Sequence, residues 1–522
     1  MALSRDVIIN YTHHDIFVPL DAAWRALQGQ WPHTDVYSPL GLAYFWQHGL
    51  AAWLWGMDGK VVIRANLIAL PVVILPALLL AWRRLNAIFT ILLIVLLTVL
   101  VVAPTFLDGP QRAIAELANY NRIGSAMCAV VCLWALCLPR ERRRLTGVAE
   151  TVVLGLVMLV LLYLKVTFFA LASATVVVGC FTVERFWRGA IGAAAVAAAG
   201  VIGLELLHPG LLSGYLADLR RVGASSTQLF RGYYAPLAFV ANLGSCVLIG
   251  ALAAATLWIA PRQWLEVAGI VVVAGGCVLV ATQNFGAFSI PLIVLIMLLA
   301  QRLAAGASSD ASSDASIHVS SGAPALRPIL EAVGVVATVM VAAPFLFTQV
   351  GGTVYSAMMS RSEGVALGSG RSETLRDVVW SPNKVEKEFV PDNFTMEEAA
   401  KWRNPPLPAA LAAAILADGI ALLQDQGLVQ RRIANLSFSN PFPVALRAPS
   451  PRGVALWWDE DRTFTVGTLT PDMILGDAEV AMVPKLWWEN KIISDLLGVA
   501  RPKLQQDFTP HESRYWTAWV KK

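Results

Sequence analysis

Residues 61–103 read VVIRANLIALPVVILPALLLAWRRLNAIFTILLIVLLTVLVVA. They contain two apolar runs, at 62–82 and 85–103, which are separated by Arg83-Arg84. A helix needs about 20 predominantly apolar residues to cross a bilayer, and both runs come close to that length. Because short cytoplasmic loops of membrane proteins are rich in Lys and Arg, the two arginines predict that the chain turns back on the cytoplasmic side.

The whole chain has the composition of a membrane protein. Its 522 residues are 57% hydrophobic and 15% charged, and the mean hydropathy is +0.60. Soluble domains carry about 25% charged residues, so a water-soluble enzyme and a disordered or fibrous protein are excluded. The net charge of +4 comes from dispersed residues, which gives no reason to expect a nucleic-acid partner. All six cysteines lie in apolar segments, so neither a disulfide framework nor a Cys-based metal site is expected.

Apolar segments of spanning length recur along the chain. The candidate spans are 62–82, 85–103, 123–138, 148–164, 166–183, 189–206, 237–258, 265–282, 286–300 and 326–349. Residues 39–56 are also apolar but include Gln47 and His48, so they suit an interfacial helix or a short span equally. We therefore expect a mainly α, polytopic transmembrane bundle of about 10–11 spans.

The charges and the low-complexity loop predict which side each part occupies. Basic residues at 140–144, 185–188 and 262 and the Ala/Ser-rich loop 303–325 indicate the cytoplasmic side. The chain after 350 turns polar and has no further span, so we expect an extracytoplasmic α/β domain there. We expect three parts: residues 1–60 form a first extracytoplasmic-type loop with juxtamembrane helices, residues 61–349 form the bundle, and residues 350–522 form the soluble domain. If 39–56 spans instead, residues 1–38 become cytoplasmic.

The polar C-terminal region shows local helix and strand patterns. Residues 396–427 predict a helix that is interrupted at Pro405-Pro406. Short strands are predicted at 432–437, 462–466 and 478–483. Trp457-Trp458 suit either the core of this domain or a contact with the bilayer surface.

The N-terminal region is the most polar part that precedes the spans. Residues 11–41 read YTHHDIFVPLDAAWRALQGQWPHTDVYSPLG. An amphipathic helix is predicted at 18–28, ending at Gly29, with Asp15 before it and Asp35 after it. Asp21 is a candidate helix cap. The residues alone suit a solvated loop whose acids cap helices as well as a functional site.

The order of these residues resembles the first extracytoplasmic loop of the GT-C membrane glycosyltransferases, which include the protein O-mannosyltransferases and the lipid A aminoarabinose transferase. Family members have an acidic residue, an amphipathic helix with Ala, Arg and Leu, a helix-ending Gly, and a Tyr/Pro-rich turn into the membrane. Here Asp15, the helix at 22–27, Gly29 and the turn 31–41 follow that order. The chain departs from the family in lacking a membrane span before this loop and the paired Asp-Glu, since Asp15 is followed by Ile16.

The resemblance implies inverting sugar transfer from a polyprenyl-phosphate donor to an envelope glycan, lipid or protein, by a multi-pass protein of the bacterial inner membrane with a periplasmic C-terminal domain. Asp15 is implied as the general base, and Asp35 is the second catalytic candidate, as an acid that orients the sugar or the acceptor. Arg and Lys side chains would stabilise the leaving phosphate. Membrane lipids are the other expected partners. The candidate substrate-binding residues are His14, Asp21, Tyr37 and, on loops expected on the extracytoplasmic side, Asn121, Arg122, Lys165, Arg220, Arg221 and Arg231. Taken alone, Lys165 also suits a side chain that only extends to the membrane surface, and Arg220-Arg221 suit a solvated helix face.

Two further expectations remain open at this point. No cofactor is required, but some relatives use a divalent metal, and His13, His14 and His33 beside the two acids would suit Zn²⁺ or Mn²⁺. The alternatives to a transferase are a transporter or flippase of lipid-linked glycans and a non-catalytic membrane scaffold with a partner-binding outer domain. A transporter would place ionisable residues deep in the spans, and few are seen there.

Overall fold

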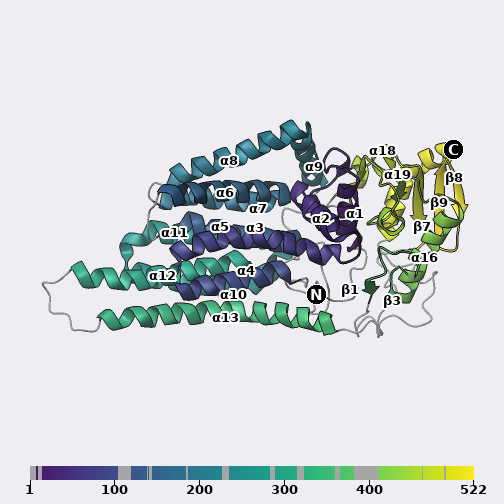
Figure 1. The fold of residues 1–522 in the computed structure, drawn as a ribbon. Helices are drawn as coiled ribbons and strands as arrows, with labels where there is room; N and C mark the ends of the chain where they lie inside the picture. The colour runs from purple at the N-terminus through teal and green to yellow at the C-terminus, as the bar shows by residue number, and fades with distance from the viewer. Residues whose placement is uncertain are drawn as a thin grey trace.

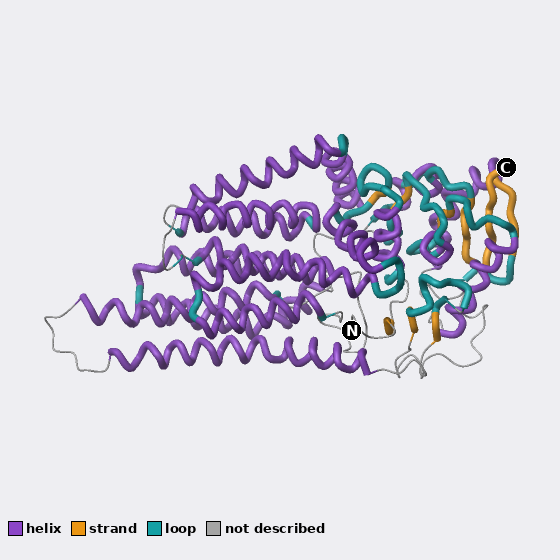
Figure 2. Tube along the Cα trace, in the orientation of Figure 1, coloured by secondary structure: helices purple, strands orange, loops and turns teal. Residues whose placement is uncertain are grey.

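Long helices packed side by side make up most of the molecule, and strands are confined to one end (Figures 1 and 2). The structure is a computed structural model. It describes residues 7–9, 15–103, 119–137, 139, 144–183, 186–225, 234–282, 289–313, 323–358, 365–368, 370–380, 409–460, 463–486 and 490–522.

Within these residues, a helix lies at each of the ten predicted spans. Six of the helices, α3, α6, α8, α10, α11 and α13, are long and apolar enough to cross a membrane, and α4, α7 and α12 contain shorter apolar segments. The chain is therefore a multi-pass membrane protein, as predicted. The bundle consists of α3 (Val61–Arg84), α4 (Ala87–Val102), α5 (Asn119–Leu136), α6 (Arg144–Leu164), α7 (Val166–Thr182), α8 (Phe186–Leu207), α10 (Tyr234–Ile259), α11 (Trp264–Thr282), α12 (Ile290–Ser313) and α13 (Ala323–Met358).

Buried charges hold together the end of the bundle that lies far from the strands. Arg83 and Arg84, at the end of α3, both pair with Glu150 of α6, with Arg84 Nη2 2.6 Å from the carboxylate. On α12, Gln301 donates to the Arg84 carbonyl (2.8 Å) and Arg302 donates to a carbonyl at the end of α5 (3.0 Å). We call these five residues the far-end clasp. Since buried charges are stable only when paired, the clasp ties four helices together.

Two short helices, α1 (Phe17–Leu27) and α2 (Leu42–Trp55), lie at the opposite end with α9 (Leu211–Ser225), between the bundle and the C-terminal region (Figure 1). α2 packs on α1 and on α3. It exposes Trp46, Trp53 and Trp55, the residue type that is enriched at membrane interfaces. Of the two alternatives for 39–56, the structure therefore supports the interfacial helix.

Two glycines allow the N-terminal segment to approach its neighbours closely. A Cβ at Gly41 would lie 2.2 Å from the Tyr163 carbonyl oxygen of α6, and one at Gly214 would lie 2.3 Å from the His33 carbonyl oxygen. Any side chain would therefore push these backbones apart. The two contacts fix the segment against α6 on one side and α9 on the other.

The C-terminal region is an α/β domain, as predicted. Its main sheet has the strand order β5-β7-β9-β8, with β5 parallel to β7 and the other pairs antiparallel. Its core contains Trp516, which is fully buried and donates to the Ile415 carbonyl (2.7 Å). The elements are α16 (Ala409–Asp425), β5 (Ile433–Asn435), α17 (Phe442–Leu446), α18 (Pro471–Leu475), β7 (Val480–Pro484), α19 (Asn490–Asp507), β8 (Phe508–Glu512) and β9 (Trp516–Lys521).

The local predictions for this domain have mixed outcomes. β5 and β7 confirm the strands at 432–437 and 478–483. The strand at 462–466 is wrong. Its described residues hold an isolated bridge at Phe464 and the start of a short 3-10 helix, because Phe464 packs against the ring of Trp458 instead of extending a sheet. The ring pair also supports the core alternative for Trp457-Trp458, which are both buried. The predicted break at Pro405-Pro406 lies outside the described residues.

The N-terminal segment supplies strands to the C-terminal region. β1 (Val7–Ile9) pairs in parallel with β4 (Val378–Trp380), which also pairs with β3 (Val365–Ala366). β2 (Val36–Tyr37) pairs in parallel with β6 (Val454–Ala455). Residues from both ends of the chain thus build two small sheets together.

A buried ion pair reinforces this junction and corrects the assignment of Asp21. Asp21 lies inside α1 and caps nothing; it is 1% exposed, and its Oδ2 accepts a hydrogen bond from Arg25 Nε at 2.8 Å. Arg25 Nη1 also donates to the Pro451 carbonyl (2.6 Å) and to Gln30 (2.8 Å). Burial raises the pKa of the Asp21 carboxyl, and the Arg25 guanidinium opposes that shift. The capping prediction failed because the helix begins earlier, after Ile16.

Replacing Arg25 with Ala should lower the free energy of unfolding by about 3 kcal/mol, because it leaves Asp21 and the Pro451 carbonyl buried without their partner. Denaturant titration of the protein in detergent, followed by tryptophan fluorescence, measures this. Arg452→Ala is the matched control: this arginine is exposed and lies 3.6 Å from Asp35, so its loss should change the stability by less than about 1 kcal/mol. Equal effects of the two variants would contradict the importance of the buried pair.

Candidate functional site

Four consecutive polar residues, Asn119 to Arg122, form the first turn of α5 at the end of the bundle that faces α2. Asn119, Asn121 and Arg122 are each 1–3% exposed. Polar side chains buried in a membrane bundle are costly and mark functional sites by default. We call these four residues the polar turn, because each of them contacts a different part of the surrounding structure.

Lys165, which directly precedes α7, joins the middle of the polar turn. Its Nζ donates to Asn121 Oδ1 (3.2 Å) and lies 4.7 Å from the centroid of the Tyr120 ring. An amide oxygen and an aromatic face both stabilise a cation. Tyr120 in turn packs edge-to-face on Tyr44 of α2. Asn121 and Lys165, which the sequence predicts separately, are thus brought together.

The ends of the polar turn bind α4 and α3. Arg122 Nε donates to the Leu100 carbonyl of α4 (2.8 Å). Asn119 Nδ2 donates to Asn66 Oδ1 of α3. The polar turn is thus joined to α4 through Arg122 and to α3 through Asn119.

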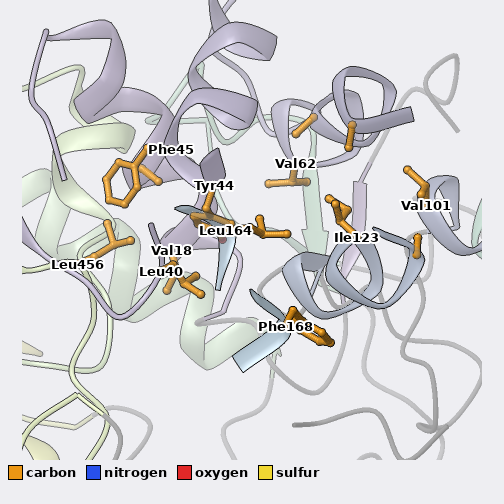
Figure 3. Packing of buried hydrophobic residues seen from close by; sticks show 14 of the residues in the cluster. Val18, Leu40, Tyr44, Phe45, Val62, Val101, Ile123, Leu164, Phe168 and Leu456 are labelled. Atoms are coloured by element: carbon orange, nitrogen blue, oxygen red, sulfur yellow. The ribbon is translucent and has the colours of Figure 1, made fainter. Parts of the chain in front are cut away.

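The polar turn lies against the main buried apolar cluster of the molecule, which includes Ile123 and against which Tyr120 packs. Figure 3 shows residues of this cluster from several helices packed close to one another. Electrostatic interactions are stronger in such a low-dielectric setting than in water. The labelled residues include Tyr44, Val62, Val101, Ile123, Leu164 and Phe168.

Several buried polar atoms on the helices of this end have no hydrogen-bond partner among the described residues. Native proteins leave few such atoms, and two of them, on Asn66 and Asn119, belong to the asparagine pair that joins the polar turn to α3. The atoms are His48 Nε2, Asn66 Nδ2, Asn119 Oδ1, the Tyr163 hydroxyl and Thr167 Oγ1.

His48 of α2 is a neutral base beside the site. Its Nδ1 donates to the Tyr44 carbonyl (2.8 Å), which leaves Nε2 as the unprotonated acceptor. Burial lowers the pKa of the ring to about 4. Sequence analysis did not select His48, although a polar pair, Gln47-His48, within an apolar helix was a usable signal.

The two predicted catalytic acids lie on either side of α1. Asp15 begins the turn into α1, where its carbonyl accepts from the Val18 amide (3.2 Å). Asp35 instead closes a local turn, since its Oδ2 accepts from the Trp31 amide (2.8 Å) and its Oδ1 lies 3.6 Å from Arg452 of the C-terminal domain.

A second polar cluster lies on α9, around an acid that the sequence analysis missed. Asp218 is 3% exposed and accepts from the Ser38 amide (3.1 Å), lies 2.8 Å from His33 Nδ1, and pairs with Arg221 (2.9 Å). Arg221 also lies 4.3 Å from the centroid of the Tyr37 ring. Two predicted substrate-binding residues, Tyr37 and Arg221, therefore meet here and not at the polar turn.

The remaining predicted residues do not join either cluster. Arg220 is exposed on α9, and Asp21 is committed to Arg25 at the junction. His13, His14 and Arg231 lie outside the described residues. Within the described part of the chain, no three His, Cys, Asp or Glu side chains come together to hold a metal ion.

No family model and no curated protein matches this chain. Among solved structures it is similar to ArnT from Cupriavidus metallidurans bound to undecaprenyl phosphate, at 12% identity and a TM-score of 0.48, with 99% of this chain and 95% of that chain covered. The apo state of the same protein gives 12% identity and a TM-score of 0.47, with 100% and 94% covered. ArnT is a lipid A aminoarabinose transferase of the GT-C class.

His48 should make the protein less stable as the pH falls. The unfolded ring takes up a proton near pH 6.5 and the folded ring only near pH 4, so stability falls across that window by about 3 kcal/mol at most. Thermal melting between pH 7.5 and 4.5 measures the loss. His48→Gln, which cannot titrate, should show a shallower fall, and the same slope in both proteins would refute the assignment.

Proposed function

We propose that the protein is an integral membrane glycosyltransferase of GT-C type, which transfers a sugar from a polyprenyl phosphate to an acceptor in the cell envelope. The observation that carries the proposal is the buried polar turn with Lys165, which lies next to the N-terminal segment that resembles the family's catalytic loop.

The cations of the site suit the phosphate of a membrane-bound carrier. Arg122 lies in the first turn of α5 and Lys165 directly precedes α7. The ends of membrane-spanning helices lie near the headgroup region, where the phosphate of a lipid carrier is found. A guanidinium fork and an ammonium both bind phosphate oxygens. The apolar side chains around them strengthen that attraction.

The chemistry requires one displacement at the anomeric carbon. The acceptor hydroxyl oxygen attacks this carbon while the bond from the carbon to the phosphate oxygen breaks. Asp15 accepts the hydroxyl proton as the general base. The bonding electrons stay on the departing phosphate, whose charge Lys165 and Arg122 stabilise. A single displacement inverts the configuration of that carbon.

The distribution of basic residues supports an outer location for this site. Arg83, Arg84 and Arg262 lie at the far end of the bundle, and cytoplasmic loops are the ones enriched in such residues. The opposite end, with residues 1–60 and 350–522, then faces the periplasm of a bacterial inner membrane. The bundle, 61–349, connects the two faces.

The far-end clasp favours a transferase over a transporter. Alternating access requires each end of the bundle to open in turn. Opening the far end would separate Arg83 and Arg84 from Glu150, which are buried together, at a cost of several kcal/mol.

Asp15→Asn and Lys165→Ala should each lower sugar transfer at least about 100-fold, because general base catalysis and charge stabilisation of the leaving group each contribute on this scale. Transfer is measured with the purified protein in nanodiscs, as radiolabelled sugar moved from synthetic polyprenyl-phosphate donors to envelope extract. Lys485→Ala, which breaks an exposed pair with Glu512, is the control and should be fully active. An Asp15→Asn protein as active as the wild type would refute the assigned base.

Cysteine labelling tests the sidedness of the two ends. In a background without the native cysteines, Thr34→Cys should react with a membrane-impermeant thiol reagent in intact cells, since Thr34 is exposed beside α1. Arg262→Cys, exposed at the far end, should react only after the membrane is opened. The reverse pattern would place the polar turn in the cytoplasm.

A further inference from the structure

Asn66 and Asn119 form a half-completed amide pair inside the bundle. Asn119 Nδ2 donates to Asn66 Oδ1, and both residues are 1% exposed. The other two amide atoms, Asn66 Nδ2 and Asn119 Oδ1, have no hydrogen-bond partner among the described residues. The pair therefore presents one donor and one acceptor to whatever binds beside it.

The position of this pair relates it to the proposed phosphate site. Asn119 and Arg122 are three residues apart on α5, so their Cβ atoms lie on one helix face, about 5–6 Å apart. In a sugar phosphate, the substituent on the carbon next to the phosphate-bearing carbon lies only a few bonds from the phosphorus. A phosphate at Arg122 and Lys165 would thus place that substituent near the asparagine pair.

We infer that Asn66 and Asn119 bind the substituent of the transferred sugar next to its phosphate-bearing carbon, and so select the sugar. This inference rests on the proposed function. The substituent must offer a donor and an acceptor together, which a hydroxyl or an acetamido group does. Both asparagines are uncharged, so the pair selects a neutral group. A protonated amine binds most strongly to a carboxylate, and the pair does not provide one.

A merely structural role for the pair makes a different prediction. Asparagines that hydrogen-bond across helices can serve simply to hold a bundle together. In that case their loss lowers the affinity for every ligand by the same factor. Asn242 of α10 provides the matched control. It is fully buried in the bundle, and its amide donates to the Ala238 carbonyl (2.7 Å) and accepts from the Ser289 amide (2.8 Å).

The experiment measures equilibrium binding in nanodiscs of three ligands: polyprenyl phosphate without a sugar, the same carrier with a hexose, and the carrier with an N-acetylhexosamine. Asn66→Ala and Asn119→Ala should lower the affinity for a sugar-bearing carrier about tenfold, because each leaves one hydrogen bond unmade. Their affinity for the bare carrier should stay within about twofold of the wild type. The sugar that shows the larger loss identifies the hydroxyl or the acetamido group.

Three results would overturn the inference. Equal losses for all three ligands, as expected of Asn242→Ala, would make the pair structural. Unchanged affinities would show that the pair touches no sugar. A wild-type protein that binds none of the carriers would refute the proposed function as well. If Lys165→Ala weakens the binding of all three ligands but neither asparagine variant changes any affinity, the inference fails and the proposed function is retained.

Discussion

A polar or charged group inside a bilayer is stable only with a partner, and this constraint organises both ends of the bundle. At the far end the charges satisfy one another, since Arg83 and Arg84 share Glu150. At the other end Lys165 lies against an amide oxygen and an aromatic ring of the polar turn, two kinds of group that stabilise a cation. The contacts of the cations thus include a shared carboxylate at the far end, and a neutral amide and a ring at the other.

The N-terminal segment connects the polar end to the C-terminal domain. α2 contributes Tyr44 and His48 to the surroundings of the polar turn, and α1 carries the Asp21–Arg25 pair that contacts Pro451. The segment thus packs on both parts, and Asp15 lies in the turn that precedes α1.

Sequence patterns predicted the helices well and the side-chain partners poorly. Each span is a long apolar run, so its length can be read locally. The role of Asp21 depends on Arg25 and on a carbonyl more than 400 residues away, which no local pattern contains. Asp218 was missed for the same reason, because its partners are His33 and the Ser38 amide. Asn66 was detectable, since an amide in an apolar span is rare.

The parallel pairing of β1 with β4 and β2 with β6 has a consequence for biogenesis. Val36 is synthesised early, and its partner Val454 follows after the whole bundle has been made. During that interval the N-terminal segment has no β6 to pair with, and the many intervening helices must insert with the correct orientation for the two strands to meet on one side of the membrane. The two small sheets therefore cannot form until the bundle between their strands has been made.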